Sequence, residues 1–183
     1  SIGRAYHHLE DHSSSINYFQ KSIKIDQFFK ESYYWLGKSL VSLDKWFEAI
    51  HYFKKAYKLN NENVDYIKSL AFAEFKVGNM VSSIDLYNRA LEIDPTDYKT
   101  SLDYSFIYYE SGNIEKAIKI IKDSIEEVPG ESLLYYRLVI YLMDSGRYKE
   151  SINILESALS LNFDNHEVLF DFVPNFETQS ALI

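Results

Sequence analysis

The chain repeats one pattern of large and small apolar residues at a constant interval of thirty-four positions. The interval is set by five isoleucines, Ile16, Ile50, Ile84, Ile118 and Ile152. A small residue precedes each isoleucine, a large apolar residue follows three positions later, and a second small residue comes three positions after that. Apolar residues at this spacing predict amphipathic helices, and the small ones allow neighbouring helices to approach closely. The sequence therefore predicts five similar helices, each in its own repeat.

A second set of columns lies upstream of each isoleucine and predicts a first helix for every repeat. Its small residues are Gly3, Gly37, Ala71 and Ser105, each after an apolar residue. Glycine inside a helix costs about 1 kcal/mol relative to alanine, so a glycine there indicates that two helices cross closely. Turn glycines recur at the same interval, as Gly78, Gly112 and Gly146, and supply the positive φ that ends a helix. Pro95 and Pro129 follow the second helices and cannot continue them.

This organisation resembles the tetratricopeptide repeat family, which has thirty-four residues per repeat, two helices and the same small-large-small signature. The clearest units run from Tyr33 to Asn61 and from Ile67 to Pro95. The resemblance implies an all-α fold, a right-handed superhelical solenoid of antiparallel helix pairs. Three residues depart from the pattern without changing the register. Val139 is larger than its column expects, Glu74 places a carboxylate in an apolar column, and Asp44 replaces a turn glycine.

We expect residues 1–183 to form a single array. Its repeats are predicted at approximately 1–29, partial at the N-terminus, then 30–63, 64–97, 98–131 and 132–165, with 166–183 as a partial sixth repeat or a capping helix. Pro174 predicts a kink or an early stop in that last helix. Phe170, Phe172 and Phe176 either cap the stack or mark a boundary inside a longer array.

Composition narrows the remaining classes of protein. The chain has no cysteine, which excludes disulfides and thiolate metal sites. Its longest apolar run, Leu133 to Met143, is too short to span a bilayer, and no signal peptide is visible. The period places Ser1 inside a first helix, so a preceding segment is expected to be missing. A cytoplasmic location is favoured, and a periplasmic one is compatible with a targeting segment that has been removed.

The first helices carry a second stripe of side chains beside the core stripe, and in the resembling family this stripe lines a concave groove. We predict that the groove binds a peptide or protein segment. The predicted groove residues are Tyr34, Lys38, Lys68, Phe72, Phe75, Lys76, Leu102, Phe106, Tyr109, Tyr136, Ile140 and Met143. The stripe is aromatic where a solvated face would be polar. Successive first helices also pack on one another, however, and some of these rings are expected to fill that contact.

Lysines gather on or beside the early part of this stripe. They are Lys38, Lys68, Lys76 and Lys99, with Asp65 and Glu31 as partial compensation, in a chain whose net charge is −8. A peptide with apolar anchors and one or two acidic groups would suit such a surface. One variant of the family grips terminal carboxylates with paired lysines and asparagines. Here Phe72 stands where the asparagine after Lys68 would be, so that clamp is not expected.

Catalytic, metal-binding and nucleic-acid-binding functions are disfavoured. Gly37-Lys38-Ser39 imitates the end of a phosphate-binding loop, but Ser32 replaces the earlier glycine and the flanks predict a helix. His7, His8 and His12 are interpreted as surface histidines rather than metal ligands. Twenty-seven acidic against nineteen basic side chains oppose binding to a phosphate backbone. We expect no enzyme activity, cofactor, metal, nucleic acid or membrane span.

Two functions of different class remain. The first is a non-catalytic scaffold for protein–protein interaction that binds a peptide or protein segment in the groove. The second is a structural scaffold that self-assembles through its exposed ends, using Ile2, Tyr6 and Leu9 or the segment 170–176. In either case the chain can be a recruiting module of a larger protein.

Overall fold

A computed structural model describes residues 2–169 of the chain. Within that range all regular elements are helices. They are α1 (Ile2–His8), α2 (His12–Ile25), α3 (Lys30–Val41), α4 (Trp46–Leu59), α5 (Val64–Lys76), α6 (Met80–Ile93), α7 (Tyr98–Glu110), α8 (Ile114–Glu127), α9 (Ser132–Asp144), α10 (Tyr148–Leu161) and the short 3-10 helix η1 (Phe163–Glu167). Odd-numbered α-helices are the predicted first helices and even-numbered ones the second helices. The predicted all-α fold of helix pairs is confirmed.

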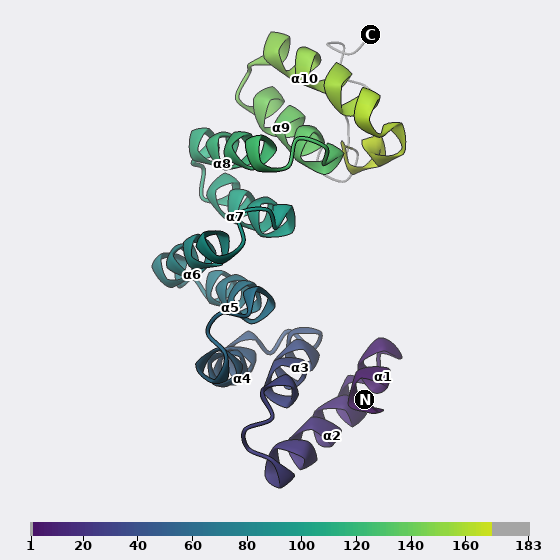
Figure 1. The fold of residues 1–183 in the computed structure, drawn as a ribbon, viewed down its shortest axis with the longest axis vertical. Helices are drawn as coiled ribbons and strands as arrows, with labels where there is room; N and C mark the ends of the chain where they lie inside the picture. Colours follow the sequence, from purple (N-terminus) through teal and green to yellow (C-terminus); the bar gives the residue numbers. More distant parts are fainter. Residues whose placement is uncertain (1, 170–183) are drawn as a thin grey trace. The chain divides into compact units, whose positions relative to one another are not determined.

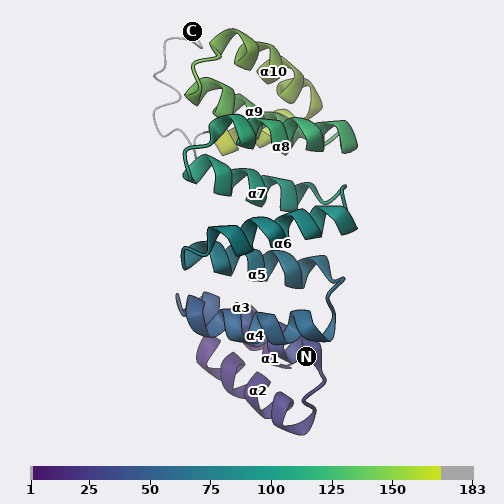
Figure 2. The same cartoon turned by 90° about the vertical axis from the view of Figure 1, so that its left-hand side faces the viewer.

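The helices belong to two compact units, an N-terminal unit (Ser1–Asp94) and a C-terminal unit (Pro95–Ile183). In the N-terminal unit each helix packs on the next one along the chain, from α1 to α6, and Figure 2 shows α4, α5 and α6 lying one above another. In the C-terminal unit α7 packs on α8, α8 on α9, and α9 on α10, with η1 against α9 and α10 (Figure 1). The prediction of one continuous array over residues 1–183 stays a prediction. The segment 170–183, including Pro174, lies outside the described residues.

The columns of small residues form the centre of each repeat. Ala49, Ala56, Ala90 and Ala117 have no exposed surface, and the large ring of Phe53 is 1% exposed. The isoleucine ladder is less uniform than the sequence suggests. Ile50 is buried because Leu70 and Ala73 of the following first helix join the same core cluster. Ile152, on the second helix α10, is 41% exposed.

The turns inside the repeats use the predicted left-handed residues. Gly78, Gly112 and Gly146 have φ of +86°, +79° and +76°. Asp44 takes the same role at φ 55°, and Glu10, which the sequence did not single out, at φ 60°. These residues let the first helix end and the chain reverse within a few positions. The helices α6 and α8 end two residues before the prolines at 95 and 129, as expected.

The glycine of the first helix is required by a ring of the second helix. A Cβ atom on Gly37 would lie 2.5 Å from Cε1 and 2.7 Å from Cδ1 of Phe53, well inside van der Waals contact. Gly3 meets Tyr18 and Phe19 in the same way. The predicted reason for these glycines, the close crossing of two helices, is confirmed.

The unusual carboxylate in the apolar column is accommodated by an ion pair. Glu74 is 1% exposed, and Lys54 of the preceding second helix places its Nζ 2.7 Å from Glu74 Oε1. Asn79 donates its side-chain amide to Glu74 Oε2 at 2.6 Å. A buried charge is tolerated only when it is paired and hydrogen-bonded, and these two partners meet that condition.

Replacing Gly37 by alanine should lower the free energy of unfolding. The new methyl group would displace the Phe53 ring, and overpacking of this kind costs about 1–3 kcal/mol, more than the ~1 kcal/mol that alanine gains in helix propensity. Urea denaturation followed by circular dichroism measures the change. In a Phe53→Leu background the cost of Gly37→Ala should shrink, because the ring is gone. A Gly37→Ala variant more stable than the parent would contradict the close crossing.

Removing Lys54 should destabilise the N-terminal unit by about 1–3 kcal/mol, because the Glu74 carboxylate would stay buried with one partner lost. The double variant Lys54→Ala with Glu74→Leu should return to nearly the parental stability, since a buried ion pair replaced by an apolar side chain is often neutral or stabilising. Denaturation of both single variants and the double variant completes the cycle. Additive losses in the double variant would show that Glu74 stabilises the repeat without Lys54.

Candidate binding surface

The predicted groove residues of the N-terminal unit lie on α3 and α5. We call this side of α1, α3 and α5 the first-helix face of the N-terminal unit. Phe72 and Phe75 on α5 are half-buried, with ring centroids 6.3 Å apart. Trp46, at the start of α4, joins them with its ring 5.9 Å from that of Phe72. Lys76 is exposed and its Nζ lies 5.5 Å from the centroid of Trp46. Partly exposed rings and a cation therefore share one surface.

A second aromatic cluster on the same face surrounds Trp35. The Arg4 guanidinium lies 4.8 Å from the Trp35 ring, and the rings of His7 and His8 lie 5.4 and 5.9 Å from it. Sequence reasoning did not place Arg4 and His7 on this face, although they stand one period before Lys38 and two periods before Phe75 of the predicted groove residues. It also missed Trp46, which belongs to a second helix and carries no signal in the stripe.

The side chain of His7 on α1 contacts α3. Its Nδ1 lies 3.2 Å from the Ser39 hydroxyl, which also approaches Ser15 at 2.8 Å. Partial burial lowers the pKa of His7 below its usual value, and the nearby positive groups His12, Lys38 and His8 lower that pKa further. Both effects oppose protonation of the His7 imidazole.

The remaining predicted residues of this unit are partly neutralised or partly buried. Lys68 forms an ion pair with Asp65 at 3.2 Å, so the expected compensation by Asp65 is seen. Tyr34 is half-buried against Tyr66, with ring centroids 4.9 Å apart, and burial raises the pKa of Tyr34. Lys38 is half-buried on α3.

In the C-terminal unit the predicted residues of α7 are half-buried, namely Leu102, Phe106 and Tyr109. The Tyr109 hydroxyl donates a short hydrogen bond to Asp144, and its ring stacks on Tyr141 at 4.9 Å and 21°. The hydrogen bond to Asp144, together with burial, raises the pKa of Tyr109 to about 12. Tyr109 is thus tied to the neighbouring first helix as well as lying on the surface.

The three predicted residues of α9 lie in the interior. Tyr136, Ile140 and Met143 are 0%, 1% and 6% exposed. The Tyr136 hydroxyl donates to the carbonyl of Asn162 at 2.9 Å, since η1 and the end of α10 pack against α9. Their part in ligand binding stays a prediction, and their burial matches the alternative that some stripe residues fill contacts between helices.

Chemistry of other kinds finds little support in the structure. Among residues 2–169 no three histidine, aspartate or glutamate side chains gather to hold a metal ion, although the rings of His7 and His12 lie 5.4 Å apart. The α3 helix runs unbroken through Gly37-Lys38-Ser39, so these residues form no phosphate-binding loop. No helix in the described range is long and apolar enough to cross a bilayer.

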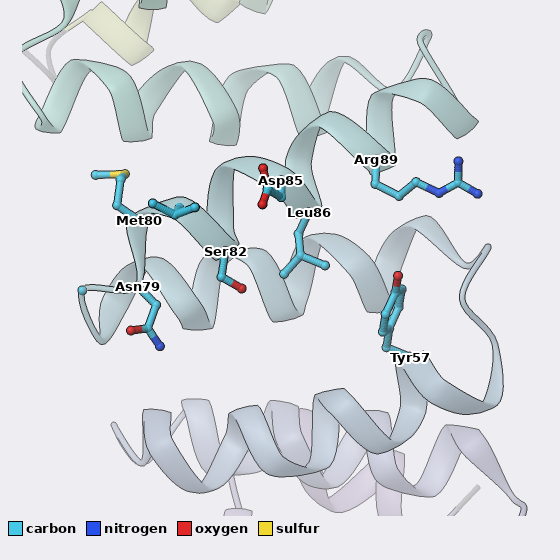
Figure 3. A pocket seen from close by; sticks show the side chains of 9 residues that line it. Tyr57, Asn79, Met80, Ser82, Asp85, Leu86 and Arg89 are labelled. Carbon is cyan, nitrogen blue, oxygen red and sulfur yellow. The ribbon is translucent and has the colours of Figure 1, made fainter.

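A cavity of about 800 Å³ lies away from the first-helix face, between the second helices α4 and α6. Figure 3 shows Tyr57 of α4 and Leu86 of α6 bordering it, with Arg89 extending to one side. Arg89 pairs with Glu92 of its own helix at 3.2 Å. The cavity is an open depression whose polar lining includes Asn79, Ser82 and Asp85, and we assign no function to it.

The fold and the faces described above define a helical-repeat protein with open, aromatic surfaces. Sequence profiles of the tetratricopeptide repeat family match residues 1–29, 30–63, 74–139 and 133–165. The chain belongs to the tetratricopeptide repeat family. A comparison with the sequences of curated proteins finds no significant match.

Several solved structures have a similar fold. A crystal structure of MamA is 22% identical, with a TM-score of 0.77, covering 91% of this chain and 98% of its own. MamA from Desulfovibrio magneticus RS-1 is 15% identical, with a TM-score of 0.75 and coverage of 89% and 92%. YrrB, described as a tetratricopeptide repeat protein with an unusual peptide-binding site, is 18% identical, with a TM-score of 0.66 and coverage of 88% and 84%. At these identities the likeness concerns the fold alone.

Proposed function

We propose that the protein is a non-catalytic interaction module that holds a peptide or protein segment on the first-helix faces of its repeats. The observation that carries this proposal is the cluster of Trp46, Phe72 and Phe75 beside the exposed Lys76. A solved structure of similar fold, YrrB, is described as having a peptide-binding site, which supports the class of function.

The physical basis is the exposed part of several large rings. Each aromatic side chain can bury about 150–250 Å², so a few half-exposed rings supply the area of an apolar patch that marks interaction sites. Rings provide this contact at low entropic cost, since they have few rotatable bonds. The nearby Lys76 ammonium can fix the orientation of a bound segment by attracting one of its acidic groups. Apolar anchors with an acidic group nearby would match this surface.

Alanine at Phe72 and Phe106 together should weaken capture of the native partner at least tenfold. Each substitution removes a half-buried ring from a first-helix face and leaves the small-residue columns of the core intact. The measurement is quantitative cross-linking in the native cell, followed by affinity measurement with the partner so identified. Phe47→Ala is the matched control, because Phe47 is 78% exposed on a second helix. Unchanged capture by the double variant, with helicity retained, would refute the proposal.

A second candidate function is self-assembly through the N-terminal end. It is favoured by the apolar side chains of α1 and the turn after it: Ile2 is 61% exposed, Tyr6 38% and Leu9 76%. Within the described residues α1 packs mainly on α2 and to a smaller extent on α3, and these three side chains stay exposed. Apolar side chains gathered on one end of a helical array are a common means of association between copies.

If the chain self-assembles in this way, its mass measured by light scattering should rise with protein concentration. The Ile2→Glu and Leu9→Glu double variant should stay at the monomer mass, because two carboxylates would oppose burial of the end. Val81→Glu on α6 is the control, since Val81 is 75% exposed away from α1. A constant monomer mass for the parent up to high concentration would rule this function out.

A further inference from the structure

The stripe positions of the first helices differ in charge between the two units. In the N-terminal unit the stripe positions hold Arg4, His7, His8, Lys38, Lys68 and Lys76. In the C-terminal unit the equivalent positions hold only neutral side chains and two acidic ones, Glu110 and Asp144. The chain as a whole has a net charge of −8, so a cationic face in its N-terminal unit runs against the composition. The packing of the repeats does not require this difference in charge. The difference therefore indicates what kind of ligand the N-terminal unit binds.

The cations of the N-terminal face are largely unneutralised by the protein. Lys68 is paired with Asp65. Arg4, Lys38 and Lys76 have no carboxylate within 4.0 Å among residues 2–169. The buried Glu74 carboxylate forms its ion pair with Lys54 and not with one of these three cations. This face therefore presents three positive groups with no acidic partner of their own.

Two of these cations lie over the only tryptophans of the chain. Arg4 is 4.8 Å from the ring centroid of Trp35, and Lys76 is 5.5 Å from that of Trp46. A cation held on an indole has lost part of its water shell and keeps its hydrogen-bond donors for another group. A carboxylate is the natural partner, since a guanidinium binds it through two parallel hydrogen bonds. The rings beside each cation then cover the apolar part of the same ligand.

We propose that the first-helix face of the N-terminal unit recognises an acidic segment of a partner protein. Arg4 and Lys38 bind one carboxylate beside Trp35, and Lys76 binds another beside Trp46. This inference rests on the proposed function and specifies the chemistry of the segment that is held. Nucleic acid also carries negative charge, but three unpaired cations in an acidic chain neutralise few phosphates, so a protein segment fits better.

The histidines make this recognition depend on pH. The charged and titratable groups around His7 are Arg4 and His8 on α1, His12 on α2, and Lys38 on α3, with the Asp11 carboxylate bonded to the Ser14 backbone amide. In the free protein partial burial, together with interactions with His12, Lys38 and His8, opposes the binding of a proton to His7. A bound carboxylate favours that proton, so binding takes up protons and strengthens as pH falls from 8 to 6. The carboxylates of the ligand stay ionised over this range.

The probe is a hexapeptide with four acidic residues, a phenylalanine and a leucine, compared with the same peptide carrying the corresponding amides. Binding is followed by tryptophan fluorescence and calorimetry, and Trp35→Phe and Trp46→Phe assign the optical signal to each cluster. The acidic peptide should bind at least tenfold more tightly than the amide peptide, with an affinity that falls as salt is raised. Arg4→Gln with Lys38→Gln should lower its affinity about tenfold. Lys55→Gln with Lys58→Gln, an equal change of charge at exposed positions of α4, should leave the affinity unchanged.

The pH arm uses the double variant His7→Gln and His8→Gln. The parent should bind the acidic peptide several-fold more tightly at pH 6 than at pH 8, and the variant should lose most of that difference. An equal difference in the variant would overturn the role given to the histidines.

The outcomes separate this inference from the proposed function. Equal affinity for the two peptides, no loss in the Arg4 and Lys38 variant, or no binding of the acidic peptide at about 1 mM would each overturn the inference. A single-stranded oligonucleotide that outcompetes the acidic peptide would overturn it in favour of nucleic acid. Failure of the proposed function has a different signature, because the Phe72 and Phe106 variant would then keep its native partner.

Discussion

The close approach of the two helices within a repeat is the constraint on which the rest of the structure depends. In the best-defined repeat the Phe53 ring lies against the backbone of Gly37, and the small residues Ala49 and Ala56 are fully buried beside it. A larger side chain at either column would push the helices apart, and a tightly packed interior absorbs such a change poorly. Because the same columns recur, each first helix meets its second helix on the same side. This contact fixes the direction in which the stripe of each first helix faces. It does not fix which side chains stand in the stripe.

Glu74 shows how far a core column can vary under that constraint. Its carboxylate occupies a position that is apolar elsewhere, and Lys54 and Asn79 satisfy it without a change of register. Such a position is nevertheless restricted, since every buried polar atom must find a partner. Whereas the stripe residues of α9 lie in the interior, those of α3, α5 and α7 are partly or fully exposed and carry less restriction. Lysine, phenylalanine and tyrosine replace one another there from repeat to repeat, which is the pattern expected of a surface shaped by what it binds.

The period predicted most of the fold because it is a local signal repeated several times. It placed the helix pairs, the left-handed turn residues from Asp44 to Gly146, and the reason for Gly37. It predicted the candidate surface less well, since accessibility depends on neighbours outside the repeat. Tyr136 is buried because η1 and the end of α10 cover α9, which no stripe reveals. Trp46 belongs to the second helix α4 and reaches the candidate surface because its ring lies beside Phe72 of α5. The thirty-four-residue spacing does not predict this contact between helices. Arg4 and His7 could have been found, because extending the stripe back by one period reaches them.

A shared fold therefore carries little information about the ligand of this protein. A structure of MamA matches 91% of this chain in fold at 22% identity, so the fold is shared while most side chains differ. The cations over Trp35 and Trp46 lie outside the columns that bring the helices together, so a protein can keep the fold and lose or reverse them. The two units of this chain illustrate the point, because the same stripe positions hold cations in the N-terminal unit and the carboxylates of Glu110 and Asp144 in the C-terminal unit. We expect specificity to lie in such side chains, because replacing them changes the surface and leaves the columns between the helices intact.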